Sequence, residues 1–186
     1  PRAIWNQLGA LRRKWISRSD HKLSTREVFS RIYEKNVWGG DGEYSSGGGS
    51  RDAHVVQPYL ERISQWTADH DGSALAAVDL GCGDFHIGKN LFQCFKSYTG
   101  IDLVPFLIEK HRREYDSPNL GFKCVDAIEE PLPGGDVIFV RQVLQHLSND
   151  QICRILPKLR TYRFAIITEH RPDPSRLIAK NLDKPH

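Results

Sequence analysis

Apolar and polar positions follow two different spacings in the second half of the chain. From residue 74 to residue 168, short apolar runs alternate with segments in which apolar residues recur at helical spacing. The runs are LAAVDL, YTGIDL, GFKCV, DVIFV and RFAIIT, and the helical segments lie around Lys89–Cys94, Pro105–Tyr115 and Asp150–Leu159. Strands that alternate with helices predict an α/β fold, in which a doubly wound, mostly parallel sheet is covered by helices on both faces.

The first part of the chain has only helical spacing. Residues 3–18 predict an amphipathic helix with the apolar positions Ile4, Leu8, Leu11 and Trp15. Ser24 and Glu27 form a capping box, which predicts a second helix with the apolar stripe Val28, Phe29, Ile32 and Tyr33. Residues 52–68 predict a third helix whose inward positions are Val55, Tyr59, Leu60, Ile63 and Trp66.

The segment WGGDGEYSSGGGS, Trp38 to Ser50, interrupts these helices. Its glycines and serines are typical of a flexible linker. Trp38 and Tyr44 are unusual in a linker, however, and equally favour a loop that orders over a ligand. We therefore divide the chain into an N-terminal helical cap with a glycine-rich loop, residues 1–50, and an α/β domain, residues 51–186.

Composition limits the function classes. The length of 186 residues suits one domain with one core, and no apolar run approaches the roughly 18 residues that a membrane span requires. Four cysteines without a C-x-x-C pair predict reduced thiols in a cytoplasmic protein and no metal site. Basic residues gather in residues 1–22, which is compatible with a solvated helix face or with weak contact to a membrane surface.

The stretch AVDLGCGDFHIG, Ala77 to Gly88, carries the candidate chemistry. It predicts a buried strand that ends at Leu80, a turn through Gly81 and Gly83, and a helix that starts near His86. Ligands of doubly wound sheets bind beyond the carboxyl ends of the strands, so this turn lies where a nucleotide-like ligand would bind.

The residues around the turn discriminate between cofactors. A nicotinamide or flavin turn, G-x-G-x-x-G, requires a third glycine at position 86, where this chain has histidine. Asp79, two residues before the first glycine, disfavours a pyrophosphate and suits a cationic ligand. The turn therefore favours a cofactor that carries positive charge and no phosphate.

Asp79, Gly81 and Gly83 match D/E-x-G-x-G-x-G, and at this point the chain resembles the class I S-adenosylmethionine-dependent methyltransferases. Phe85 replaces the third glycine of that motif, and we expect its ring beside the methionine arm of S-adenosylmethionine. The resemblance covers about residues 74–170 and implies the strand order 3-2-1-4-5-7-6. Because only five strands are predicted, we expect either that the C-terminal strands are missing from the printed sequence or that the domain is truncated.

The resemblance also assigns residues after the next strands. Asp102 follows Gly83 by 19 residues and is expected to contact the ribose hydroxyls, and Leu103 is expected to contribute to cofactor binding. Asp126 and Ala127 are expected to contact the adenine. Arg141 and Gln142, after the fourth strand, are expected to contact the carboxylate of the cofactor or the acceptor, although a surface role fits each of them equally.

The acceptor is predicted from residues after the fourth and fifth strands. His146 is the first candidate for a general base and His170 the second, although His146 also fits a structural role at a helix start. The chain lacks the [N/D/S]-P-P-[Y/F] clamp of base-amine methyltransferases and a cysteine nucleophile in these loops. We therefore expect O- or N-methylation of a small molecule or sugar rather than of nucleic acid.

Two further readings of the same sequence stay open. One is a nicotinamide-dependent oxidoreductase, against which Asp79 and His86 speak. The other is a non-catalytic module that keeps the cofactor fold and acts as a partner subunit. We also expect Trp38 and Tyr44 to wall the pocket if the cap closes over the ligands.

Overall fold

The computed structural model describes residues 23–40 and 44–169. Its centre is a five-stranded parallel sheet in the order β3-β2-β1-β4-β5, which confirms the predicted α/β class and the first five places of the expected strand order. The strands are β1 (Ala76–Leu80), β2 (Ser97–Asp102), β3 (Leu120–Cys124), β4 (Val137–Arg141) and β5 (Phe164–Thr168). The predicted helix at residues 3–18 and residues 170–186 lie outside the described part.

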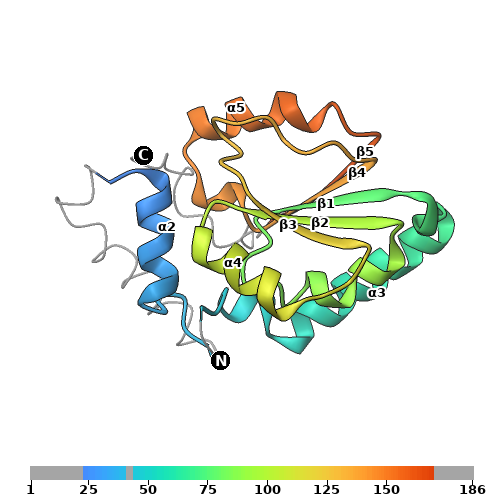
Figure 1. Cartoon of the computed structure of the whole chain (residues 1–186), viewed down its shortest axis with the longest axis horizontal. Coiled ribbons are helices and arrows are strands. Elements are labelled where there is room, and N and C mark those ends of the chain that lie inside the picture. The colour runs from blue at the N-terminus through green and yellow to red at the C-terminus, as the bar shows by residue number, and fades with distance from the viewer. Residues whose placement is uncertain (1–22, 41–43, 170–186) are drawn as a thin grey trace, which may run out of the picture.

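Helices cover both faces of this sheet, as Figure 1 shows. Alternation along the strands explains the arrangement, because successive side chains point to opposite faces. On one face, Ala77 and Phe139 pack with α3 (Ala53–Asp69) and α4 (Pro105–Glu114). On the other face, Val78 and Ile138 pack with α5 (Asn149–Leu159).

The cap helix α2 (Thr25–Glu34) lies beyond the carboxyl edge of the sheet. The predicted capping box is confirmed, since the Ser24 hydroxyl accepts from the Glu27 N–H and the Glu27 carboxylate accepts from the Ser24 N–H at 2.7 Å. The apolar side of α2 packs against the domain through Tyr33, which is buried with Val104 and Leu107. These contacts hold α2 over the strand ends.

Of the inward positions predicted for α3, Tyr59, Leu60, Ile63 and Trp66 lie in or against the core as expected, and only Val55 is wrong. Val55 is 42% exposed, whereas Val56 is buried with Ile63 and Thr67 on the inner side of α3. Positions 56, 63 and 67 lie seven and four residues apart and therefore share one side of the helix, from which Val55 points away.

The predicted helix after the glycine turn does not form. Residues 88–94 instead make two single 3-10 turns, Gly88–Asn90 and Phe92–Cys94. Phe85, just before this segment, has a backbone φ of +57° and therefore lies outside the right-handed helical region. The turn is consequently not followed by the N-terminus of an α-helix near His86.

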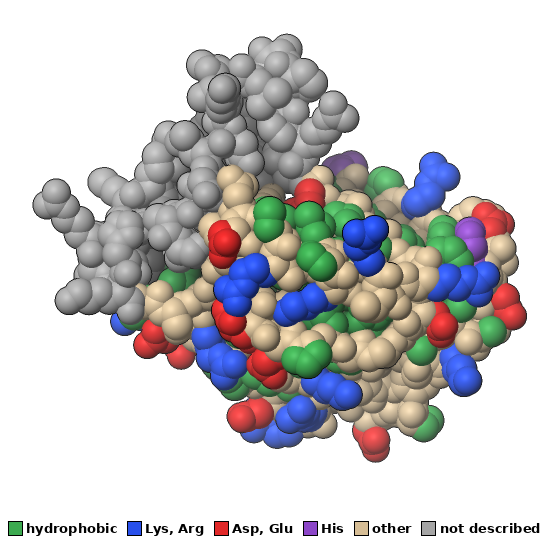
Figure 2. Space-filling model, turned by 90° about the horizontal axis from the view of Figure 1, so that it is seen from above, with side chains coloured by type: hydrophobic (Ala, Val, Ile, Leu, Met, Phe, Trp, Pro, Cys, Tyr) green, Lys and Arg blue, Asp and Glu red, His purple; other side chains and the backbone are tan. Residues whose placement is uncertain are grey.

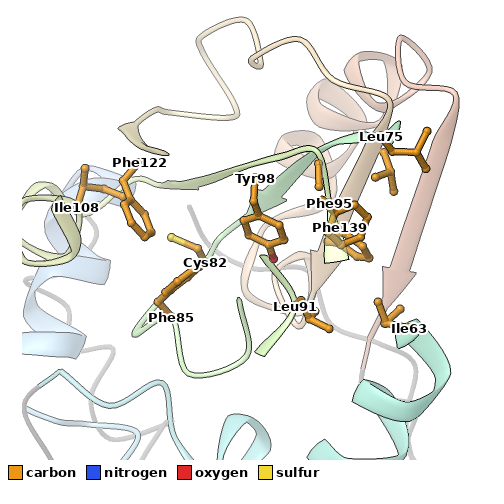
Figure 3. Packing of buried hydrophobic residues seen from close by; sticks show 12 residues of the cluster. Ile63, Leu75, Cys82, Phe85, Leu91, Phe95, Tyr98, Ile108, Phe122 and Phe139 are labelled. Atoms are coloured by element: carbon orange, nitrogen blue, oxygen red, sulfur yellow. The ribbon is translucent and has the colours of Figure 1, made fainter. Parts of the chain in front are cut away.

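The side chain of Phe85 explains why this backbone conformation is retained. Its ring is fully buried, packs edge-on against Tyr98, Tyr115 and Phe122, and does not line the ligand cleft. Figure 3 shows Phe85 in this buried cluster with Tyr98 and Phe122. The expectation that Phe85 lies beside the methionine arm is therefore wrong. Burial of a phenyl ring is worth roughly 2–3 kcal/mol, which offsets the roughly 1–2 kcal/mol cost of a left-handed non-glycine residue.

Gly88 has no room for an added methyl group. A Cβ at Gly88 would overlap the Phe85 ring, which has no free space into which to move. We expect Gly88→Ala to lower the free energy of unfolding by about 1–3 kcal/mol in urea titrations. Gly121→Ala is the matched control, because a Cβ there has no neighbour within 4 Å. Equal stabilities of the two variants would contradict this packing.

Candidate functional site

A cleft opens at the carboxyl ends of β1, β2, β3 and β4, below α2. The structure brings together nearly all the predicted cofactor residues in its lining: Asp79, Gly81, Asp102, Leu103, Asp126, Ala127 and Arg141, with Gln142 and His146. Gly83 is adjacent, between the lining residues Cys82 and Asp84. His170 lies outside the described residues. Residues that are up to 67 positions apart in the sequence therefore form one site.

The glycine turn is tied to the neighbouring strand by its own backbone. The N–H groups of Gly81 and Cys82 both donate to the Ile101 carbonyl, at 2.8 and 3.0 Å. Gly81 and Gly83 have φ values of +73° and +54°, which glycine adopts without strain. A side chain at Gly81 would also overlap Val143. Both glycines are therefore required by geometry and leave the backbone open toward the cleft.

Asp102 closes the turn from β2. One carboxylate oxygen accepts the Gly83 N–H and the other accepts the Val104 N–H, each at 3.0 Å. Burial raises the pKa of Asp102, and the two N–H donors oppose that shift. The carboxylate thus has a structural partner on each oxygen and still lines the cleft.

Asp79 is the second buried carboxylate, on the adjacent strand. It is 8% exposed and accepts a hydrogen bond from the Tyr98 hydroxyl at 3.0 Å. Burial raises the pKa of Asp79 to about 6, the Tyr98 hydrogen bond opposes this, and the nearby Asp102 adds to it. Two partly desolvated carboxylates on adjacent strands favour a ligand that brings positive charge.

Arg141 supplies the opposite charge across the same cleft. Its guanidinium donates from Nη2 to the Gly49 carbonyl at 2.7 Å and lies over the Tyr59 ring at 5.0 Å. Its Nε is buried and has no hydrogen-bond partner among the described residues. A site with both a buried acid and a half-buried guanidinium complements a zwitterion, such as the end of a free amino acid.

The loop before α3 is attached to the glycine turn by residues to which the sequence gave no role. The Asp84 carboxylate accepts from the Ser46 N–H at 3.0 Å and from Arg51 Nη2 at 2.9 Å. The Asp84 N–H in return donates to the Ser46 hydroxyl at 2.9 Å. A free linker would lack such reciprocal bonds. Asp84, the acid directly after Gly83, is the feature of the sequence that could have indicated this attachment.

The two loop aromatics have different positions. Trp38 lines the cleft, as the sequence predicts. Tyr44 does not line it; its ring packs on Phe106 at 4.6 Å and lies beneath Lys110. The expectation that both residues wall the pocket is therefore correct only for Trp38.

His146 lies at an aromatic end of the cleft. Its ring is 5.1 Å from the Trp38 ring and 6.2 Å from the Phe29 ring of α2. His146 ends a short 3-10 turn, Leu144–His146, that begins after β4. The imidazole is thus presented to the cleft beside rings contributed by the cap.

Glu169 fixes that short turn and was missed by sequence reasoning. Its carboxylate accepts from the N–H groups of Val143 and Leu144, at 2.9 and 2.8 Å, and from Gln145 at 3.4 Å. An acid on the first amides of a turn is a favourable pairing. In the segment EH after β5, the sequence indicates the histidine as a site residue, whereas in the structure the glutamate binds the turn that carries His146.

Asp126 and Ala127 are held by a support from α5. The Asp126 carboxylate accepts from the Ile128 N–H at 2.9 Å, which makes a tight turn after β3. Lys158 donates from Nζ to three backbone carbonyls: Ala127 at 2.8 Å, Ile128 at 2.9 Å and Glu130 at 2.7 Å. Hydrogen bonds within the protein therefore hold this edge of the cleft in place.

Two searches of the described residues bear on other functions. No group of three His, Cys, Asp or Glu side chains within residues 23–40 and 44–169 is arranged to hold a metal ion. Over the same residues, no helix has the length and apolar character needed to cross a membrane.

Comparison with known proteins places these features in a family context. The family model described as "Methyltransferase domain" matches residues 78–162, which contain the glycine turn, Asp102, Asp126 and His146. No curated protein sequence matches the chain significantly.

Solved structures show the same fold. The N-methyltransferase NodS from Bradyrhizobium japonicum WM9, in complex with S-adenosyl-L-homocysteine, is similar with a TM-score of 0.54 and 18% identity over 72% of this chain and 67% of that chain. Magnesium protoporphyrin IX methyltransferase from Synechocystis PCC 6803, with bound S-adenosylmethionine, has a TM-score of 0.55 and 18% identity over 74% and 71% of the two chains. This chain covers 61% to 71% of the length of the protein chains in these two structures and in a second structure of NodS.

The raised pKa of Asp79 predicts how its removal changes stability with pH. Because the folded state holds the Asp79 proton more tightly than the unfolded state, the free energy of unfolding falls as pH rises from about 4 to about 6. Asp79→Asn removes this loss and keeps an acceptor for Tyr98. We expect the variant to gain about 1–3 kcal/mol relative to wild type between pH 4 and pH 8 in urea titrations. A stability difference that does not change with pH would contradict a buried, ionisable Asp79.

Proposed function

We propose that this chain is a class I S-adenosylmethionine-dependent methyltransferase and that it methylates a hydroxyl or an amine of a small molecule or sugar; the family match and the fold support this. Of the similar structures, NodS is described as an N-methyltransferase and the Synechocystis protein as acting on magnesium protoporphyrin IX. Both descriptions are compatible with the proposed class of acceptor.

The observation that carries the proposal is the pairing of buried carboxylates with a guanidinium in one cleft. S-adenosylmethionine, when bound, supplies a methyl group activated by a sulfonium. We assign Asp79 to its cationic amino-acid end and Arg141, whose Nε has no other partner among the described residues, to its carboxylate. The open backbone at Gly81 and Gly83 allows close approach of this part of the ligand.

The remaining cofactor contacts follow from the lining of the cleft. We assign Asp102 and Leu103 to the ribose and Asp126 and Ala127 to the adenine. Asp102 retains lone pairs beyond the two N–H groups that it already accepts, because a carboxylate has about four acceptor positions. The support of Lys158 beneath Ala127 keeps the adenine end rigid.

The same charges disfavour a dinucleotide. A pyrophosphate at this turn would lie near Asp79 and Asp102, two carboxylates whose pKa values are already raised by burial. Like charges in a partly desolvated site repel strongly. A nicotinamide oxidoreductase is therefore the weaker proposal.

The acceptor is assigned to the aromatic end of the cleft. His146 is placed to take a proton from a nucleophile that arrives protonated, with Trp38 and Phe29 as apolar walls and Glu169 holding the turn that carries it. His170 is retained as a second candidate base. Acidic and basic side chains are interspersed among the described residues of the face shown in Figure 2.

Calorimetric titration tests the cofactor. We expect heat of binding with S-adenosylmethionine and none with NAD. Asp102→Ala should weaken S-adenosylmethionine binding by about 1–3 kcal/mol, because a buried charge-assisted contact is lost. The matched control is Asp136→Ala, since Asp136 accepts the Ala76 N–H at the amino-terminal edge of β1 and lies outside the cleft. No heat with S-adenosylmethionine would overturn the proposed cofactor.

A second test concerns His146. His146→Ala should leave the Kd for S-adenosylmethionine within about threefold of wild type and lower turnover by roughly 10²–10⁴-fold on an acceptor that needs deprotonation. His70→Ala is the control, because His70 caps the far end of α3 and stacks on Trp66. Unchanged turnover in His146→Ala would remove His146 as the base. Binding without turnover on any acceptor would instead favour the non-catalytic module.

A further inference from the structure

We propose that His111 is a positioning residue for the cofactor turn and sets the affinity for S-adenosylmethionine without contacting it. The inference rests on the proposed cofactor and goes beyond it, because His111 lies on α4 and does not line the cleft. It acts through Gly83, the residue that Asp102 holds from the other side.

The contact between His111 and the turn is short and fully buried. His111 is 1% exposed, and its Nε2 lies 2.7 Å from the Gly83 carbonyl oxygen. A carbonyl oxygen can only accept, so Nε2 carries the proton. The Nδ1 atom is buried without a hydrogen-bond partner among the described residues, which fits a neutral ring with a fixed tautomer.

Gly83 is thereby held at both of its polar groups. Its N–H donates to Asp102 at 3.0 Å, and its carbonyl accepts from His111. With a φ of +54°, Gly83 is in a conformation from which a glycine backbone rotates easily. Loss of the imidazole would leave a buried carbonyl without a partner, and the turn would relieve this by rotating away from Asp102.

The surroundings of His111 separate this role from ordinary core packing. Its ring lies 5.1 Å from the Phe122 ring and 5.7 Å from the Phe85 ring, so an apolar side chain would satisfy the packing alone. Burial lowers the pKa of His111, which keeps the ring uncharged beside these rings. What the histidine adds is one donor, aimed at Gly83.

Two variants test the donor separately from the packing. His111→Leu keeps an apolar side chain and removes the donor, whereas His111→Gln keeps an N–H donor at a similar reach. We expect S-adenosylmethionine to bind about tenfold or more weakly to His111→Leu, and within about threefold of wild type to His111→Gln. Leu159→Ala controls for lost stability, because Leu159 is a buried residue of α5 on the opposite face of the sheet and outside the cleft.

Calorimetry and thermal melts on the full chain give the readout. Weaker binding in His111→Leu but not in Leu159→Ala, at comparable losses of Tm, supports the proposal. Equal Kd values for wild type and His111→Leu, or equal losses of affinity in His111→Leu and Leu159→Ala, overturn it and leave the proposed function standing. Failure of the wild-type chain to bind S-adenosylmethionine overturns the proposed function and this assignment together.

A spectroscopic measurement covers the case in which His111→Leu does not fold. Nitrogen chemical shifts of the imidazole in the wild-type protein at pH 7 should show Nε2 protonated and Nδ1 unprotonated. A ring protonated at Nδ1 alone overturns the proposal, because its unprotonated Nε2 could not donate to the Gly83 carbonyl.

Discussion

The cost of burying carboxylates governs this structure. Asp79 and Asp102 lie on adjacent strands at one edge of the sheet, and an uncompensated acid at such a position would destabilise the fold. Each carboxylate is therefore compensated by a fixed donor: the Tyr98 hydroxyl for Asp79, and two backbone N–H groups for Asp102. One of these donors, the Gly83 N–H, belongs to the turn after β1, so the compensation of Asp102 also holds this turn at the edge of the cleft.

The compensation extends from the turn to the cap. Gly83 and Asp84 connect Asp102 with Ser46 and Arg51, and Arg141 connects the end of β4 with Gly49. Residues on both sides of position 50, where the sequence suggested a boundary, therefore share one network of polar contacts. The glycine-rich loop is part of the site in the structure, although its composition resembles that of a linker.

The sequence predicts those parts of the molecule that depend on local pattern. Alternating apolar runs predict the five strands, and the spacing of Gly81, Gly83 and Asp102 predicts which residues meet at the sheet edge. What it does not predict depends on distant contacts. The segment after Phe85 has apolar residues at helical spacing, but it forms two 3-10 turns, and Leu91 between them is buried in the core cluster with residues of other elements. The supporting roles of Lys158 and Glu169 are invisible in sequence because each acts on backbone atoms far along the chain.

The packing of Phe85 has a consequence for how this turn varies among sequences. The ring occupies the space into which a side chain at position 88 would project, so an aromatic residue at position 85 commits position 88 to glycine. The residue types at positions 85 and 88 are therefore not independent of one another. A chain with a glycine at the first position would be released from that requirement at the second, and we expect the pair to change together in evolution.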